Sequence, residues 1–222
     1  MLHILVDLFE QNRDEKKAIP MQNYMKNHFP FFGIKTPERR RAVKQFFEAS
    51  GILKKDFQEG LVLDLWKKDE REYQYAALDY IEKSMKKLNI QHLPFLEQLI
   101  TSKSWWDTVD MLAPKPVGAI ALKHPEVIAE RIDGWAYGNH LWLRRSAILF
   151  QLKYKEHTDE ALLYQYIEQN KGSKEFFIQK AIGWALREYS KTNPASVRTF
   201  IESTDLPNLS VREGSKYIIR KR

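Results

Sequence analysis

Residues 142–152 read W-L-R-R-S-A-I-L-F-Q-L, and their apolar positions recur every three or four residues. This period is that of an α-helix with one buried face. Residues 71–83 have the same period, and so do most other segments of the chain. The one Asp-Gly pair, Asp133-Gly134, lies between helical stretches and not between alternating strands. The sequence therefore predicts an all-α protein of about a dozen helices, each about 10–18 residues long.

Three of these helices share a short pattern with alanine in its third position. Residues 75–78, 145–148 and 179–182 read Y-A-A-L, R-S-A-I and Q-K-A-I, so the alanines are 70 and 34 residues apart. A spacing of about 35 residues, with two helices per unit, is typical of stacked helical repeats. We expect a single domain over residues 1–222, a curved α-solenoid of antiparallel helix pairs whose concave face is the binding surface.

The composition excludes several kinds of site. The chain has 222 residues, of which 43% are hydrophobic, and this suffices for a packed core. It has no cysteine, which excludes disulfides and thiol chemistry, and its six histidines show no metal-binding spacing. No apolar run is long enough to span a membrane, and the N-terminus lacks a signal-peptide pattern. We therefore expect a cytoplasmic protein that uses no metal, cofactor or membrane.

The net charge of +7 is concentrated in the second half of the chain. Residues 1–111 carry 18 basic and 17 acidic residues, whereas residues 112–222 carry 18 and 12. A basic half favours a polyanionic partner such as nucleic acid, and would place the protein on the nucleoid when bound. The alternative, that the excess charge only keeps the protein soluble, has about equal weight.

Helix-start signals, each a cap residue or a first-turn proline, occur at four places. They are Thr36-Pro37, Asp56-x-x-Glu59, Ser104-x-x-Asp107 and Asn193-Pro194.

Two prolines follow the third of these signals. A helix carbonyl accepts from the N–H four residues on, so Pro114, which has no N–H, leaves the carbonyl of Asp110 open. Pro116 repeats the effect two residues later, and we expect the helix to break or kink near Ala113. Alternatively, the prolines simply end a helix that begins at Ser104.

Three tryptophans each precede a charged residue by three or four positions, which places both side chains on one helix face. The pairs are Trp106 with Asp110, Trp142 with Arg145, and Trp184 with Arg187. If these helices face one groove, it contains rings that stack on bases or sugars and arginines that bind phosphates. The alternative is that the tryptophans fill the core with the charges at its rim, which is commoner for any single pair.

Five longer segments carry a family resemblance. They are Y24-M-K-N-H-F29, T36-P-E-R-R40, K103-S-W-W-D-T-V-D110, residues 142–155 and residues 174–194. These segments resemble the AlkD-type DNA alkylation repair glycosylases, a family with HEAT-like helical repeats. The resemblance implies a HEAT-like fold and hydrolysis of the N-glycosidic bond of alkylated purines, such as N3-methyladenine and N7-methylguanine, in duplex DNA.

The resemblance also implies roles for individual residues. Asp110 would be the catalytic carboxylate, with Trp106 and Trp184 flanking the sugar and backbone at the lesion. Arg145 would hold the adjacent phosphate, and Tyr24 would lie close to the same site. Further DNA contacts are expected from residues that begin a helix or lie in the basic half, although each could instead belong to a solvated helix face. They are Lys35, Thr36, Arg39, Arg40, Lys153, Lys180, Arg187 and Arg212.

One carboxylate is chemically sufficient for such substrates. An N3- or N7-alkylated purine is already cationic and leaves readily, so no general acid is required. The carboxylate then stabilises an oxocarbenium-like sugar and orients the attacking water. We therefore predict a monomeric, monofunctional DNA glycosylase of base excision repair. The alternative is a non-catalytic helical-repeat scaffold that binds DNA or protein.

This chemistry predicts selectivity between two substrates. The protein should release 7-methylguanine from duplex DNA but not uracil, because a neutral base needs more help to leave than one carboxylate supplies. The measurement is the amount of free base after incubation with each duplex. Efficient release of uracil would contradict the mechanism.

Overall fold

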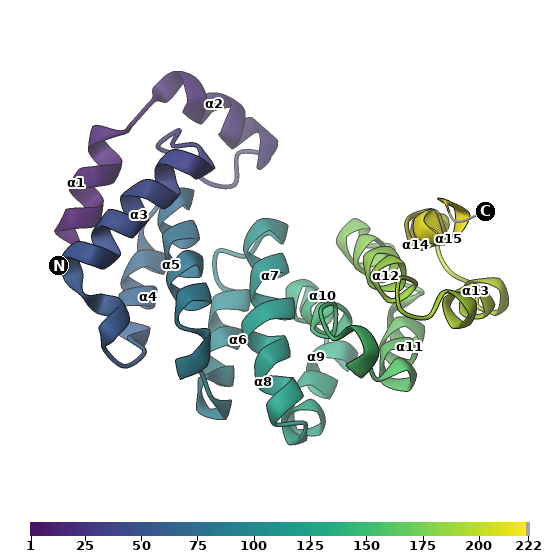
Figure 1. The fold of residues 1–222 in the computed structure, drawn as a ribbon. Coiled ribbons are helices and arrows are strands. Elements are labelled where there is room, and N and C mark those ends of the chain that lie inside the picture. Colours follow the sequence, from purple (N-terminus) through teal and green to yellow (C-terminus); the bar gives the residue numbers. More distant parts are fainter. Residues whose placement is uncertain (221–222) are drawn as a thin grey trace. The chain divides into compact units, whose positions relative to one another are not determined.

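A computed structural model describes residues 1–220 of the chain, and within this part every regular element is a helix (Figure 1). The predicted all-α class is confirmed. The chain forms two compact units, Met1–Leu88 and a second that begins at Asn89. Each unit is described by itself, and the expectation of a single domain over residues 1–222 stays a prediction. No helix of the described residues is long and apolar enough to cross a membrane.

The first unit packs five α-helices and two short 3₁₀ turns. Their bounds are α1 (His3–Gln11), α2 (Glu15–Tyr24), α3 (Thr36–Ser50), η1 (Ile52–Lys54), α4 (Glu59–Lys67), α5 (Arg71–Lys83) and η2 (Met85–Lys87). Helix α3 contacts both α1 and α5, and α4 packs on α5.

A buried carboxylate fixes the loop between α2 and α3 in this unit. Glu72 is fully buried at the start of α5 and accepts hydrogen bonds from the backbone N–H groups of Phe32, Gly33 and Ile34, at 3.0–3.1 Å. Gly33 has φ 86°, which a residue with a Cβ adopts only with strain, and an added Cβ would lie 2.1 Å from the carbonyl oxygen of Asp14. The loop that leads into α3 is therefore tightly specified.

The second unit contains the remaining helices. Their bounds are η3 (Ile90–His92), α6 (Leu93–Thr101), α7 (Trp106–Leu112), η4 (Ala113–Val117), α8 (Gly118–Lys123), η5 (Ile128–Ile132), α9 (Asp133–Tyr137), α10 (Leu141–Leu149), η6 (Lys155–His157), α11 (Glu160–Asn170), α12 (Phe176–Tyr189), α13 (Pro194–Ser203), α14 (Asn208–Gly214) and α15 (Lys216–Arg220). Several are shorter than the expected 10–18 residues.

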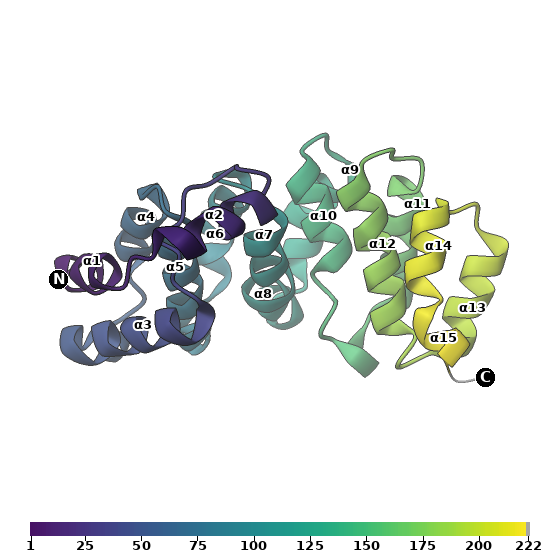
Figure 2. The ribbon, with the colours of Figure 1, turned by 90° about the horizontal axis from the view of Figure 1, so that it is seen from above.

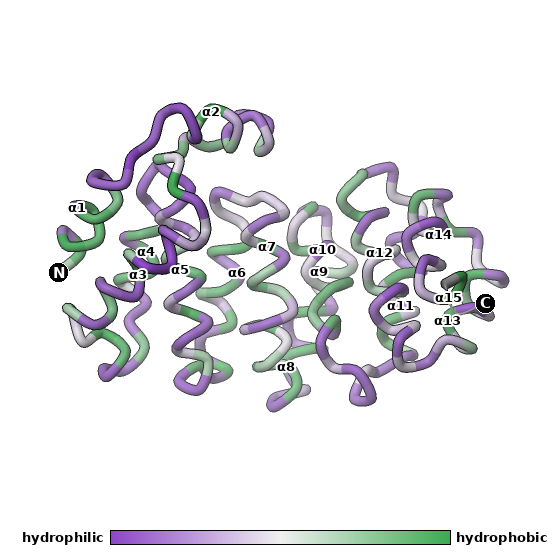
Figure 3. The backbone as a smooth tube through the Cα atoms, turned by 45° about the horizontal axis from the view of Figure 1, so that its top comes forward, coloured by the Kyte–Doolittle hydropathy of each residue, from purple (hydrophilic) through white to green (hydrophobic). Residues whose placement is uncertain are grey.

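Four helices of this unit, α7, α10, α12 and α14, are neighbours in that order, with α10 contacting α7 and α12, and α12 contacting α14 (Figure 2). Hydrophobic and hydrophilic residues alternate along these helices (Figure 3), as the 3.6-residue period requires. The three repeated alanines, Ala77 in α5, Ala147 in α10 and Ala181 in α12, are all buried.

The two prolines do not end their helix, but the α-helix changes to a π-helical turn at Ala113. Residues 106–123 run through α7, a π-helical turn (η4) that contains Pro114 and Pro116, and α8. Gly118 N–H donates to the carbonyl of Ala113, five residues back, as a π-helix requires. The wider π turn tolerates Pro114 and Pro116 because its hydrogen bonds are donated by other residues, such as Gly118, and not by the prolines, which have no N–H group. The change from α-helix to π-helix occurs at Ala113, where a break or kink was expected, and the kink itself stays a prediction. The alternative, a helix end at the prolines, was wrong.

The helix-start signals were partly correct. Asn193 caps α13 by accepting from Ser196 N–H at 3.2 Å, with Pro194 as the first helical residue. Ser104 does not cap α7, because its Oγ donates back to the carbonyl of Ile100 at 2.6 Å and Trp105 occupies the cap position. Two other cap assignments were also wrong, since Thr36 lies inside α3 after Lys35, and α4 begins after Gln58 without a side-chain cap.

Helices α12 and α14 approach closely at Gly183. A Cβ on Gly183 would lie 2.5 Å from Cβ of Glu213 and 3.0 Å from the carbonyl oxygen of Ser210. Ser210 Oγ also donates to the carbonyl of Gln179 at 2.9 Å, across the same contact. These contacts set the distance between the two helices.

We predict that Gly183→Ala lowers the free energy of unfolding by about 1–3 kcal/mol, because the new methyl group forces α14 away from α12. Gly134→Ala is the matched control: Gly134 is also helical, but nothing lies within 4 Å of an added Cβ. That change should be neutral or stabilising by up to about 1 kcal/mol. Urea unfolding of both variants measures the difference, and equal effects would contradict the packing argument.

Candidate functional site

A buried ion pair joins α7 to α10 in the second unit. Asp110, in the last turn of α7, accepts from Arg145 of α10 through both carboxylate oxygens, with Nε–Oδ1 2.7 Å and Nη2–Oδ2 2.8 Å. Their side chains are 15% and 5% exposed, respectively. A third N–H of Arg145 donates to the carbonyl of Phe177 on α12. One guanidinium therefore connects three helices.

Aromatic rings form an apolar cluster beside this pair. Trp105, Trp142 and Phe177 contact each other pairwise, with ring centroids 5.0–5.7 Å apart. The Arg145 guanidinium lies 5.8 Å from the Phe177 ring. Trp142 is a buried core residue, as the core alternative expects, but Arg145 is buried as well and does not lie at the rim.

Burial raises the pKa of the Asp110 carboxyl above its ordinary value, because the charged form loses solvation. The hydrogen bonds and positive charge of Arg145 oppose this rise, and the nearby charge of Asp107 adds to it. Arg145 thus favours the ionised carboxylate in a place where burial alone would favour the acid.

Trp106 and Trp184 lie on the helices that carry this site. Trp106 is the first residue of α7, one turn before Asp110, and its side chain is half-buried. Trp184 is half-buried on α12 and packs against the core of the unit. It follows Phe177 by seven residues, which is two turns along the same helix face and about 10 Å. Both rings retain exposed surface.

Apart from Arg145, the predicted DNA contacts of the second unit fall into two groups. Lys180 and Arg187 of α12 both pair with the buried carboxylate of Glu213, at 3.1 and 3.0 Å. Lys153 and Arg212 are exposed, in the turn after α10 and on α14. Arg145, predicted to hold a phosphate, is 4% exposed and directs three of its N–H groups at protein oxygens, so its phosphate contact stays a prediction.

The remaining predicted contacts lie in the first unit. Tyr24 is 69% exposed at the end of α2, and Lys35, Thr36 and Arg40 are exposed at the start of α3. Arg39 differs, because it is buried, lies 3.4 Å from Asp79 and stacks 4.8 Å from the Tyr75 ring centroid. The expected proximity of Tyr24 to Asp110 stays a prediction.

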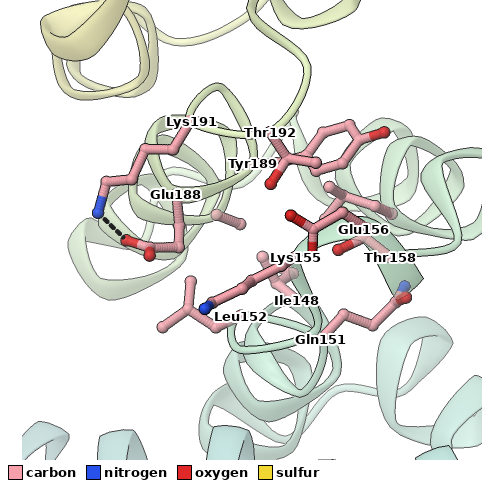
Figure 4. A pocket seen from close by; sticks show the side chains of 12 residues that line it. Ile148, Gln151, Leu152, Lys155, Glu156, Thr158, Glu188, Tyr189, Lys191 and Thr192 are labelled. Atoms are coloured by element: carbon pink, nitrogen blue, oxygen red, sulfur yellow. Dashed lines mark hydrogen bonds and ion pairs between the residues drawn. The ribbon is translucent and has the colours of Figure 1, made fainter.

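A cavity of about 170 Å³ lies elsewhere in the second unit, at the C-terminal ends of α10 and α12 (Figure 4). Its lining includes Leu152, Lys155 and Tyr189, and the Glu188–Lys191 ion pair at its edge is 2.6 Å long. The Arg145 side chain that holds Asp110 contacts Phe177 at the other, N-terminal end of α12, so the cavity is not part of the Asp110 site. Among the described residues, no group of three histidine or acidic side chains could hold a metal ion.

Sequence reasoning missed two residues that organise the site. Phe177 supplies both a carbonyl for Arg145 and a ring for the aromatic cluster, and Glu213 gathers the cations of α12. Neither contact follows a local spacing, because the partners are more than 25 residues apart. For Phe177 the signal was that residues 174–194 formed a long segment of family resemblance, whereas Glu213 lies outside that segment.

Comparison with known proteins gives a consistent result. The model of a family of DNA alkylation repair enzymes matches residues 5–218. A solved structure described as a predicted DNA alkylation repair enzyme from Enterococcus faecalis is similar, with 34% identity and a TM-score of 0.85. The alignment covers 93% of this chain and 97% of that one. No curated protein matches significantly.

We predict that Arg145→Ala destabilises the protein by about 3–5 kcal/mol at pH 7, because Asp110 is left buried without its counter-charge. The loss in the free energy of unfolding, relative to the unaltered protein, should be smaller near pH 4.5. Without Arg145 the folded-state pKa of Asp110 rises further above the unfolded value of about 3.9, so folding binds a proton and stability falls as the pH rises between the two values. Urea unfolding at the two pH values measures this.

The control is Asp110→Asn combined with Arg145→Ala. This double variant has no carboxylate at position 110. Its free energy of unfolding should therefore differ from that of Asp110→Asn by the same amount at both pH values. A deficit of Arg145→Ala that is equal at both pH values would show that the pair does not control the ionisation of Asp110.

Proposed function

This chain belongs to the family of DNA alkylation repair enzymes, and we propose that it is a DNA glycosylase that hydrolyses the N-glycosidic bond of cationic alkylated purines in duplex DNA. The observation that carries the proposal is the buried Asp110 carboxylate, held by Arg145 one turn after the partly exposed Trp106. The bases that we propose it releases are N3-methyladenine and N7-methylguanine. We further propose that the fold consists of HEAT-like helical repeats and that the protein acts as a monomer in base excision repair.

The substrate supplies part of the chemistry. Alkylation at N3 or N7 puts a positive charge on the purine, so the glycosidic bond breaks with the electron pair leaving on a base that becomes neutral. The sugar is left as an oxocarbenium-like cation, which a carboxylate stabilises electrostatically. A water attacks the anomeric carbon of the sugar and transfers a proton to Asp110, which completes hydrolysis.

Arg145 makes Asp110 suitable for this role. A buried carboxylate is otherwise prone to protonation, and a protonated acid neither stabilises a cation nor accepts a proton. The bidentate contact uses one side of each oxygen and leaves lone pairs for a water or the sugar. The proposed role of Arg145 in the free protein is therefore to hold and ionise Asp110, and contact with a phosphate would come in addition.

The two half-buried tryptophans fit the same reaction. An indole face attracts a cation, by about 1–2 kcal/mol when both are desolvated. Trp106 lies on the same face of α7 as Asp110 because four residues separate them. We assign Trp106 and Trp184 to the sugar cation and the flanking backbone.

The alternative is a non-catalytic scaffold that binds DNA or protein. A carboxylate in a basic surface repels phosphate, which argues against a pure DNA-binding scaffold, although pairing with Arg145 weakens this repulsion. The family assignment favours the enzyme. We further propose that the protein acts in the cytoplasm, on the nucleoid.

The test is base release from methylated duplex DNA. Asp110→Asn should release 3-methyladenine and 7-methylguanine about 10²–10³-fold more slowly than the unaltered protein, because the group that stabilises the sugar cation is lost. It should bind unmodified DNA at least as tightly, since a negative charge is removed and the Arg145 charge is freed. Equal rates of release would refute the assignment of Asp110.

Two further variants make the result interpretable. Asp107→Asn removes a partly exposed carboxylate from the same helix and should release bases at nearly the unaltered rate. If Asp110→Asn is too unstable to assay, because it leaves Arg145 buried and unpaired, Asp110→Asn with Arg145→Gln removes both charges together. That double variant should also be inactive, and an active one would exclude the mechanism.

A further inference from the structure

Three cations in the second unit converge on one buried carboxylate. Glu213 of α14 is 8% exposed, and its Oε1 lies 3.1 Å from Lys180 Nζ. Its Oε2 lies 3.0 Å from Arg187 Nη1 and 2.7 Å from Lys216 Nζ. These side chains come from three helices, α12, α14 and α15. We call Lys180, Arg187 and Lys216 the Glu213 cluster.

The cluster has more positive charge than its carboxylate can neutralise. Lys216 and Lys180 lower the pKa of Glu213 to about 2, so it is ionised at neutral pH. Three cations and one anion leave an excess of two positive charges. The cations are 32–46% exposed, whereas Glu213 is buried, so the excess charge faces solvent. Like charges at this spacing repel each other, and Glu213 is what holds them together.

The position of the cluster is fixed relative to Trp184. Lys180 precedes Trp184 by four residues and Arg187 follows it by three, so all three share one face of α12. Gly183 allows α14 to pack directly on this helix, and Ser210 bonds across the contact. A half-buried aromatic ring therefore lies between two of the three cations.

We propose that the Glu213 cluster is a binding site for backbone phosphates of DNA next to Trp184, with Glu213 as the residue that positions the cations. The proposal adds Lys216 and Glu213 to the predicted DNA contacts Lys180 and Arg187. The three cations bind the phosphates together, because one carboxylate holds them all. The proposal rests on the proposed function in taking DNA as the partner. Two excess charges match two phosphodiesters, each of which carries one negative charge.

A nearby ion pair provides a matched control. Lys191 is 49% exposed and lies 2.6 Å from Glu188, while Lys216 is 46% exposed and lies 2.7 Å from Glu213. The two lysines thus have similar exposure and similar contacts. The Glu188–Lys191 pair has no excess charge, so it should contribute little to phosphate binding.

The experiment compares Lys216→Gln with Lys191→Gln in binding to unmodified duplex DNA between about 50 and 200 mM salt. Lys216→Gln should weaken binding about fivefold to tenfold at 0.1 M salt and reduce the slope of log K against log salt by about one. Lys191→Gln should leave both nearly unchanged. Equal effects of the two changes, or no effect of Lys216→Gln, would overturn the proposal.

A double-mutant cycle tests the positioning role of Glu213. If Glu213 holds Lys216 for the phosphate, Lys216→Gln should cost only about twofold in a Glu213→Gln background, because the free lysine is no longer in place. If Lys216→Gln weakens DNA binding by the same factor with and without Glu213→Gln, then Glu213 does not position Lys216 for the phosphate. A structural role for Glu213 would change the melting temperature but not this coupling.

Two further readouts separate the possible outcomes. Inorganic phosphate, added at constant ionic strength, should raise the melting temperature of the unaltered protein no more than that of Lys216→Gln. If phosphate raises it only when Lys216 is present, and Lys216→Gln still binds DNA as tightly as the unaltered protein, then the site binds free phosphate and the assignment to DNA fails. Since unmodified DNA is the probe, base release plays no part. Weaker binding by Lys216→Gln together with full activity of Asp110→Asn would refute only the catalytic proposal.

Discussion

The Asp110–Arg145 ion pair constrains everything around it in the second unit. Taking both charges out of water costs several kcal/mol for each ion, and their attraction offsets that cost only when the geometry is close and the remaining donors are satisfied. Here both oxygens are engaged and a further N–H reaches the carbonyl of Phe177. Helices α7, α10 and α12 must therefore keep their relative positions for the pair to survive.

The same pair connects stability with chemistry. Burial raises the pKa of the Asp110 carboxyl, because the charged form loses solvation. The guanidinium acts against that rise through a fixed bidentate contact. A carboxylate that is partly desolvated yet ionised interacts strongly with a developing cation, which is the property that the proposed hydrolysis needs.

Several other basic residues that were predicted to contact DNA form ion pairs within the protein itself. Arg39 is buried against Asp79, and the Glu213 cluster surrounds one carboxylate. The count of basic residues therefore overstates how many are exposed for DNA. Lys35 and Arg40 in the first unit, and Lys153 in the second, are exposed. Internal carboxylates reduce the net field but fix the geometry of the cations, which favours defined phosphate positions over diffuse attraction.

The sequence by itself determined the features that depend on local spacing. The helical period, the Asn193 cap and the shared face of Trp106 and Asp110 involve residues within one or two turns of each other. Such contacts follow from the geometry of a single helix. The family resemblance further predicted that Asp110, Arg145 and Trp184 belong to one site, and the structure brings Asp110 and Arg145 into contact.

Only the tertiary structure decided which charges meet. Asp110 and Arg145 are 35 residues apart, and Glu213 is 26 residues from Arg187. It also decided that Ser104 bonds backwards to Ile100 and that the prolines lie in a π turn. Each of these depends on how helices pack, since burial makes an unpaired charge or N–H costly and so selects a partner from a distant part of the chain. No local spacing encodes that choice.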